Sequence, residues 1–267
     1  MNNKDFIKIK YPGVRVFTSD TGRINRDKHY VKALLEVDIT TALQKLKALR
    51  VPGKKVSFQA WFIKLLADSV ALHPPVNGIQ KGRDQVLVFR SVNISTVVEK
   101  VVDGVPVPLP LTLKGANKKT CYELNDELQA AISQPIADSS SPALGKGENK
   151  LLIKLALALP QWLRLFIMRT FILGDPHRMQ QMMGTVMVTS VGAVRHLSGW
   201  ILPTSMHPLS IAIGSINKKP AIFEGEVQKR SILHLTVAVD HDLIDGIPAM
   251  QFVDDFVRKL EKGSGLD

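Results

Sequence analysis

The sequence contains a single cysteine, Cys121. One thiol cannot form an internal disulfide or a cysteine-rich zinc site, which excludes a disulfide-stabilised secreted domain. Residues 1–10 show no signal-peptide pattern. We therefore expect a protein of the reducing cytoplasm, in which Cys121 packs as a small hydrophobic residue.

Aromatic residues are scarce, at 6% of the chain, and this argues against the stacking platforms that bind single-stranded nucleic acid. The 35 basic and 24 acidic residues give a net charge of +11, but the basic residues are dispersed in pairs (54–55, 118–119 and 218–219) and form no continuous patch. We expect no nucleic-acid partner. The surplus would attract a phosphorylated ligand first and an anionic membrane surface second.

No apolar run is long enough to cross a membrane. The most apolar segment, Leu151–Leu173, is interrupted by three basic residues. Its longest uncharged stretch, Leu155–Leu163, is well short of the roughly 20 residues that a spanning helix needs, and it contains Pro160. If the helix continues through Pro160, its polar side chains share one side and leave a wide apolar face. Such a helix covers a core or a subunit interface, lies on a membrane surface, or forms a lid over an apolar substrate.

The chain of 267 residues is 45% hydrophobic and 22% charged, which is enough for one large core or two small ones. Strands are predicted at 31–40, 85–90, 92–98, 185–190, 210–216 and 231–239, and helices at 41–50, 56–72, 121–132 and 247–262. Residues 133–149 are rich in Ser, Pro and Gly and predict a flexible loop. The strands after this loop are too few to form their own core, so we expect them to complete the sheet begun earlier, in one domain spanning 1–267.

Two segments indicate where their elements lie in the sheet. A turn at Asp103-Gly104 leads into a strand interrupted by prolines, which is typical of a sheet edge. In the last helix, five apolar residues at spacings of three and four are expected to pack on the sheet: Ile247, Met250, Val253, Val257 and Leu260.

Polar residues gather where the strand 231–239 ends. The segment LHLTVAVDHDLIDGIPA contains Asp240, His241 and Asp242, then Asp245 and Gly246 before a helix. The end of a strand can present a side chain to a cleft, and a glycine after the acid suits a tight turn. In a purely structural alternative, Asp245 caps or braces the turn and His241 packs without a catalytic role. A metal site would need a third ligand, for which His207 or His234 could approach in space.

The run DHDLIDG, at 240–246, resembles the D-H-R-x-x-D-G signature of the catalytic domain of dihydrolipoamide acyltransferases, and the H-x-x-x-D-G of chloramphenicol acetyltransferase. Upstream, GTVMVTSVGAV, at 184–194, resembles the family's G-x-F-T-I-S-N-L-G segment. The buried helix at 56–72 with its Pro and Asn turn, and the strand, crossover and helix at 92–128, are similar as well. The resemblance covers most of 31–260 in collinear order.

The resemblance implies an α/β fold of the chloramphenicol acetyltransferase type, a mixed β-sheet flanked by helices. It also implies a homotrimer, or a higher oligomer of trimers, with active sites at subunit interfaces. In the family the motif histidine, here His241, takes a proton from a thiol of coenzyme A or dihydrolipoamide. Thr189, with Ser190 next in line, matches the hydroxyl that stabilises the oxyanion. Asp245 matches the aspartate that braces the turn, and Gly246 is expected to permit that turn.

Neighbouring strand residues point to opposite faces, so only one of Thr189 and Ser190 should face the site. A thiol of pKa about 8.5 is mostly protonated at neutral pH, and an imidazole, with an ordinary pKa of about 6.5, can deprotonate it.

The chain departs from the family in four ways. It shows no lipoyl domain, subunit-binding domain or Ala/Pro-rich linker, so we expect a stand-alone version without a covalently attached lipoyl group. Asp242 stands where the family has arginine, and a carboxylate beside the base would favour its protonated form. Residues 1–30 match poorly, and the amphipathic segment 151–183 is an insertion.

The leading hypothesis is a trimeric acyltransferase that moves an acyl group between a thioester, such as acyl-coenzyme A, and an acceptor, without a metal. The alternative is a non-catalytic scaffold, or a membrane-surface binding module acting through 151–173, that retains the fold. The acyl group and the acceptor are not identifiable from the sequence.

Overall fold

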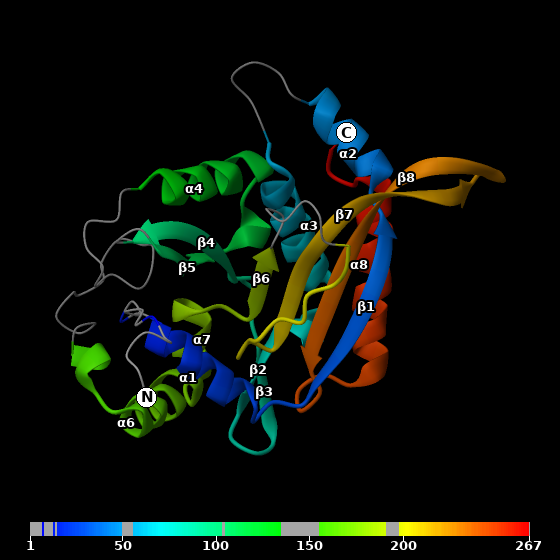
Figure 1. Cartoon of the computed structure of the whole chain (residues 1–267). Helices are drawn as coiled ribbons and strands as arrows, with labels where there is room; N and C mark the ends of the chain where they lie inside the picture. The colour runs from blue at the N-terminus through cyan, green and yellow to red at the C-terminus, as the bar shows by residue number, and fades with distance from the viewer. Residues whose placement is uncertain are drawn as a thin grey trace.

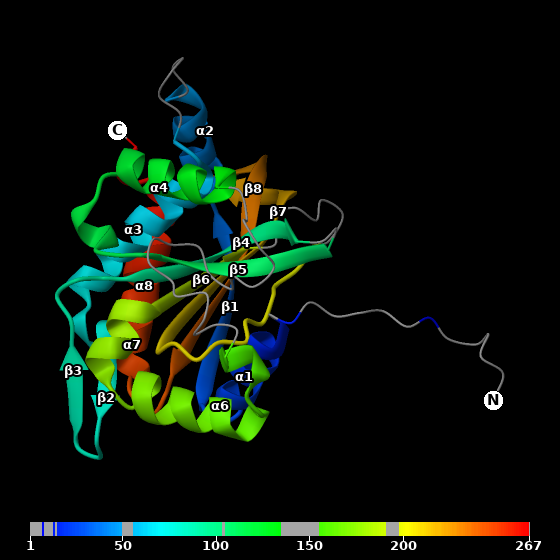
Figure 2. The same cartoon turned by 90° about the vertical axis from the view of Figure 1, so that its left-hand side faces the viewer.

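The computed structural model describes residues 7, 13, 15–49, 56–102, 105–134, 155–190 and 198–266 (Figures 1 and 2). Several predicted features lie outside these residues. They are the 103–104 turn, the 54–55 lysine pair, nearly all of the 133–149 loop, residues 151–154, and residues 191–194 of the upstream motif.

A six-stranded mixed sheet forms the centre of the fold. Its strands are β1 (Tyr30–Asp38), β4 (Ile94–Val102), β5 (Val105–Leu113), β6 (Val186–Ser190), β7 (Leu209–Phe223) and β8 (Glu226–Asp240), in the spatial order β1-β8-β7-β6-β4-β5. β6 pairs in parallel with β4 and β7, and the other pairs are antiparallel. The mixed sheet is confirmed, as is the expectation that strands from both sides of the 133–149 segment join it. The proline-containing strand β5 lies at a sheet edge, as predicted.

The helices are α1 (Arg15–Asn25), α2 (Thr40–Ala48), α3 (Phe58–Leu72), α4 (Cys121–Ser133), α6 (Gln161–Ile167), α7 (Pro176–Met182) and α8 (Gly246–Lys262), with a π-helical segment η3 (Met168–Leu173). Short 3-10 turns, η1 and η2, cover Pro74–Asn77 and Ala116–Lys118. A small hairpin pairs β2 (Gly78–Lys81) with β3 (Gln85–Val88). The sequence did not predict α1 or β2, whereas α7 lies within the segment 151–183, which is expected to be an amphipathic helical insertion.

The core lies between one face of the sheet and α2, α3, α4 and α8. Phe62 of α3 meets Phe256 of α8 edge to face, with ring centroids 5.4 Å apart. The predicted stripe on α8 is partly wrong, since Ile247 and Met250 are 75% and 57% exposed. The buried stripe instead contains Phe252, Val253, Phe256 and Leu260, because the first turn of α8 extends beyond the core.

The apolar segment after residue 154 is not one helix through Pro160. Residues 155–158 form a helical turn, and α6 then begins at Gln161 with Pro160 as its N-cap. A proline lacks the N–H that a helix interior requires, so it begins the new helix. Neither α6 nor η3 contains a fully buried residue. Among the described residues, no helix has the length and apolar character needed to cross a membrane.

The hairpin of β7 and β8 is longer than the sequence predicted. Figure 1 shows it projecting beyond the helices. The additional pairs run from Asn217↔Ile232 to Phe223↔Glu226 and include several lysines and an arginine. A hydrophobic pattern does not predict this part of the strands, because its residues are largely polar. Backbone hydrogen bonds between the two strands stabilise it, and not burial.

A buried histidine, His207, connects the start of β6 to the start of β7. Its Nε2 lies 3.1 Å from the carbonyl oxygen of Met183 and its Nδ1 lies 2.9 Å from Ser205 Oγ. A neutral ring satisfies both contacts when Nε2–H donates to the carbonyl and Nδ1 accepts from the hydroxyl. Burial lowers the pKa of His207 to about 4.

This histidine predicts an acid-sensitive fold. Between pH about 6.5 and about 4 the unfolded chain binds a proton at residue 207 that the folded chain does not. Folding stability should therefore fall as the pH drops through that window, by up to about 3 kcal/mol from this group. His207→Gln should make stability less dependent on pH by a similar amount, measured by urea unfolding at a series of pH values. His177→Gln, at an exposed site on α7, is the control, and equal slopes in wild type and His207→Gln would refute the assignment.

Candidate active site

His241 lies on the tight turn that joins β8 to α8. The backbone N–H groups of Leu243 and Ile244 both donate to the carbonyl oxygen of Asp240, at 3.1 Å. The N–H of His241 donates to the carbonyl oxygen of His29 at 2.9 Å, and the His241 side chain is exposed. The turn therefore holds the backbone of His241 while it presents the imidazole outward.

A buried ion pair anchors this turn. The carboxylate of Asp240 is completely buried and accepts from Lys28 Nζ at 2.6 Å. An unpaired buried carboxylate would cost several kcal/mol, so Lys28 is a requirement of this position. Burial, and then the charge of Asp240, raise the pKa of Tyr30, which keeps its hydroxyl protonated. That hydroxyl donates to the carbonyl oxygen of His207 at 2.7 Å.

Asp242 has a partner other than His241. Its two carboxylate oxygens lie 2.9 and 3.0 Å from Nδ1 of His29. Both side chains are exposed, at 46% for Asp242 and 77% for His29, so solvent screens the pair. Asp242, which stands where the family has arginine, therefore has His29, from the segment before β1, as its partner.

Asp245 and Gly246 follow at the start of α8. Asp245 is exposed and occupies the N-cap position, but its side chain does not cap the helix. Gly246, expected to permit the turn, lies where any residue would fit. Its backbone does not have a positive φ, and a Cβ added there would meet nothing within 4 Å. The turn is made instead by the two bonds to the Asp240 carbonyl.

Thr189 and Ser190 end β6 and, by strand alternation, face opposite sides of the sheet. Thr189 is half-buried and lies on the face away from the helical core, beside Ala212 of β7. The same face carries two buried hydroxyls, Ser210 Oγ and Thr236 Oγ1, for which the described part of the chain provides no hydrogen-bond partner. Thr189 therefore belongs to a hydroxyl-bearing sheet surface and not to the turn of His241.

A glycine fixes the start of the strand that carries Thr189. Gly184 has a φ of +74°, and a Cβ there would lie 2.2 Å from the carbonyl oxygen of Asn93. Asn93 also donates from Nδ2 to the carbonyl oxygen of Gln180 at 2.8 Å. This close approach explains why the upstream motif begins with glycine.

Within one chain, Thr189 and His241 are far apart. Thr189 is level with Ala212, which pairs with Thr236, and His241 follows Thr236 by five residues. At about 3.3 Å per residue along β8, and about 4.8 Å for each of the two strand spacings, the separation is roughly 19 Å. Since β6 and β8 run in opposite directions, their carboxyl ends lie toward opposite ends of the sheet. One chain therefore cannot bring both side chains to one carbonyl group.

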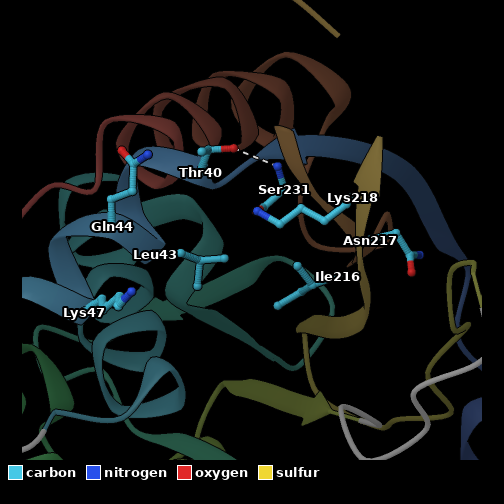
Figure 3. Close-up of a pocket in the computed structure, with 8 residues that line it drawn as sticks. All are labelled: Thr40, Leu43, Gln44, Lys47, Ile216, Asn217, Lys218 and Ser231. Atoms are coloured by element: carbon cyan, nitrogen blue, oxygen red, sulfur yellow. Dashed lines mark hydrogen bonds between the residues drawn. The ribbon is translucent and has the colours of Figure 1, made fainter. Parts of the chain in front are cut away.

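One pocket lies away from the turn of His241 (Figure 3). It opens between α2 and the base of the β7–β8 hairpin and is lined by Thr40, Leu43, Gln44, Lys47, Ile216, Asn217, Lys218 and Ser231. The N–H of Ser231 donates to Thr40 Oγ1 at 2.7 Å, which ties the two walls together. Ser231 precedes His241 by ten residues along one extended strand, so this pocket is not part of the turn. A shallower hollow follows Asp245 directly, lined by residues of the first turns of α8 that include Ile247 and Met250.

The two histidines considered as metal ligands have other partners. His207 is bound as described above, and His234 contacts Ser215 Oγ at 3.0 Å and lies 3.3 Å from Glu36. The described residues include no group of three His, Cys, Asp or Glu side chains that could hold a metal ion.

The sequence did not identify Lys28, His29 and Tyr30, which contact the turn. Residues 1–30 resemble the family poorly, and nothing local links residue 28 to residue 240. The signal that could have found them is the pairing of β1 with β8, which places Tyr30 opposite Asp240. Polar residues immediately before the first strand are therefore neighbours of polar residues immediately after the last one.

Comparison with known proteins identifies the family of the chain. The family of 2-oxoacid dehydrogenases acyltransferase catalytic domains matches residues 27–143 and 176–266, which leaves out most of the amphipathic insertion. Relatives in sequence are the dihydrolipoyllysine-residue acetyltransferase components of the pyruvate dehydrogenase complexes of Mycoplasma pneumoniae (25% identity over 80% of this chain) and Bacillus subtilis (22% over 86%). The chain spans less than half of these proteins, covering 44% of each.

Solved structures share the fold. A probable dihydrolipoamide acetyltransferase from Listeria monocytogenes superimposes with a TM-score of 0.67 at 19% identity, covering 98% of this chain and 97% of that one. The cubic core of a pyruvate dehydrogenase multienzyme complex gives a TM-score of 0.68 at 14% identity, covering 99% and 95%. The family match includes both the turn of His241 and the strand of Thr189. The chain belongs to the family of 2-oxoacid dehydrogenase acyltransferase catalytic domains.

Proposed function

We propose that this chain is a single catalytic domain that transfers an acyl group between the thiol of coenzyme A and an acceptor, with His241 as general base. The observation that carries the proposal is the exposed imidazole of His241 on a turn fixed by the Lys28–Asp240 pair, within a matched family motif. Thr189 is the proposed oxyanion donor and Asp245 the residue that braces the turn in the assembled protein.

The proposed chemistry balances as follows. A ring nitrogen of His241 takes the proton from the attacking thiol, and the resulting thiolate attacks the thioester carbonyl carbon. The carbonyl oxygen becomes an oxyanion that accepts a hydrogen bond from the Thr189 hydroxyl, a contact worth about 3 to 4 kcal/mol in comparable reactions. When the tetrahedral intermediate collapses, the C–S bond to the leaving group breaks and the imidazolium returns its proton to the departing sulfur.

The site requires two subunits. Because Thr189 and His241 of one chain lie roughly 19 Å apart, we propose that a trimer brings Thr189 of one copy to His241 of the next. Ile247 and Met250, exposed beside the turn, provide apolar surface for that contact. A related solved structure is described as a cubic core, which fits trimers that assemble further.

The remaining proposals concern partners and location. The surplus of +11 attracts the phosphates of coenzyme A. The reaction needs no metal and no lipoyl group attached to these residues, and we place the protein in the cytoplasm. A non-catalytic scaffold with the same fold is the rival, and it predicts no binding of coenzyme A by calorimetry.

Removal of the proposed base should abolish turnover. We expect His241→Ala to lower kcat for acyl transfer from acetyl-coenzyme A by about 10²–10⁴-fold, and Thr189→Val by about 10²–10³-fold. Conversion of acetyl-coenzyme A to coenzyme A is followed by chromatography, because transfer from one thiol to another leaves the total thiol concentration unchanged. The matched controls are His177→Ala, an exposed histidine on α7, and Ser190→Ala, on the opposite face of β6. Full activity in His241→Ala would refute the mechanism.

A mixed assembly tests the shared site. His241→Ala and Thr189→Val chains, each inactive alone, are denatured together in equal amounts and refolded. If each site takes His241 and Thr189 from different copies, one site in four has both residues, and about a quarter of the wild-type activity should return. If the mixture stays inactive while wild type refolded in the same way is active, the site does not combine these residues across subunits.

A further inference from the structure

The helix formed by α6 and η3 has its polar side turned inward. Two of its four polar side chains contact Asp20 of α1: Gln161 Nε2 donates to it at 2.9 Å and Arg164 Nε at 2.7 Å. A third, Arg169, pairs with Asp27, just after α1. Asp20 and Arg164 are 2% and 11% exposed, so this is a buried ion pair. Breaking such a pair is costly, and it therefore fixes the rotation of the helix about its axis.

The outward face is consequently apolar. Trp162, Phe166 and Phe171 are 70%, 56% and 50% exposed, and Leu155 in the preceding helical turn is 58% exposed. A surface helix of a soluble protein normally has the opposite arrangement, with charges outward and apolar residues inward. Figures 1 and 2 show α6 beside α1 at the periphery of the molecule, away from the core helices α3 and α8.

The elements around this face are strongly basic. Residues 15–29, 78–90 and 161–183, which form α1, the β2–β3 hairpin and α6 to α7, contain ten lysines and arginines but only four aspartates and no glutamate. The hairpin adjoins α7, where Phe89 meets His177 with ring centroids 5.7 Å apart. Both views place the hairpin tip and α6 at the same end of the molecule. With Lys28 neutralised by the buried Asp240, these elements still carry a net charge of +5, nearly half of the +11 of the whole chain, around one apolar face.

We propose that the outer face of α6 and η3, defined by Trp162, Phe166 and Phe171, docks on an anionic membrane surface. The apolar side chains enter the boundary between headgroups and acyl chains, where a tryptophan is well accommodated. The basic residues of the surrounding elements add longer-range attraction to the anionic surface, worth up to about fivefold in affinity each. A symmetric contact between two copies through this face would bring two positive surpluses together, and that disfavours a second copy as the occupant.

The contact is independent of acyl transfer, so its failure would leave the proposed activity untouched. The full chain is sedimented with vesicles of equimolar phosphatidylcholine and phosphatidylglycerol, and with vesicles of phosphatidylcholine alone. We expect binding to the anionic vesicles that weakens as salt rises, because the Debye length falls from about 10 Å at 0.1 M to about 3 Å at 1 M. Phe166→Ser combined with Phe171→Ser should weaken binding at least tenfold. Arg23→Ser combined with Arg26→Ser should also weaken it, by up to about 25-fold.

The matched control is Leu72→Ser combined with Ile132→Ser, which removes two exposed apolar residues from α3 and α4. It should leave binding unchanged, and circular dichroism melting checks that all variants fold. Absence of sedimentation with anionic vesicles overturns the proposal, as does equal loss in the control. A third outcome is that wild type does not bind vesicles and that the Phe166 and Phe171 variant changes the sedimentation coefficient of the free protein. In that case the face is an interface between copies, and the membrane assignment is wrong.

Discussion

The buried carboxylate of Asp240 is the constraint from which the candidate site is built. It lies at the end of the interior strand β8, completely removed from solvent, and Lys28 reaches it from the residues that precede β1. Because the same aspartate also accepts two backbone hydrogen bonds through its carbonyl oxygen, one residue closes the turn and anchors the neighbouring segment. Loss of either charge would leave the other uncompensated, so the position of His241 depends on an ion pair that takes no part in the chemistry.

This arrangement explains how the chain accommodates Asp242 beside its proposed base. His29 follows Lys28 directly, and its ring meets the carboxylate of Asp242 while its carbonyl oxygen binds the N–H of His241. In this segment, Lys28 supplies the cation for the buried Asp240. His29 supplies the ring that contacts the exposed Asp242, and the carbonyl oxygen that accepts from the N–H of His241. The carboxylate at position 242, unfavourable in the motif alone, has its partner more than two hundred positions earlier in the chain.

The sequence predicted elements whose signal is local. The helix Phe58–Leu72, the strand that ends at Asp240 and the edge strand with prolines all have patterns visible within about fifteen residues. It did not predict α1, whose partner is α6, or the outer half of the β7–β8 hairpin, which backbone pairing stabilises without burial. The motif and the family likeness identified His241 and Thr189 as candidates, but the contacts of Lys28 and His29 arise from β-sheet pairing over long sequence distances. The pattern of 151–173 predicts an amphipathic helix, but the Asp20–Arg164 pair is what shows that the polar side of α6 is the inner one.

The sheet topology also limits where a complete site can form. β6 and β8 lie on either side of β7 and run in opposite directions, so a hydroxyl near the end of one and an imidazole after the end of the other must diverge. No adjustment of a loop can close a gap of roughly 19 Å between residues fixed on the same rigid sheet. If both residues serve one reaction, each copy contributes Thr189 to one site and His241 to another, at opposite ends of its sheet. In a ring of three copies, every Thr189 can then meet the His241 of a neighbouring copy. The strand directions therefore connect the proposed chemistry to assembly, since the activity of this fold would depend on its oligomer.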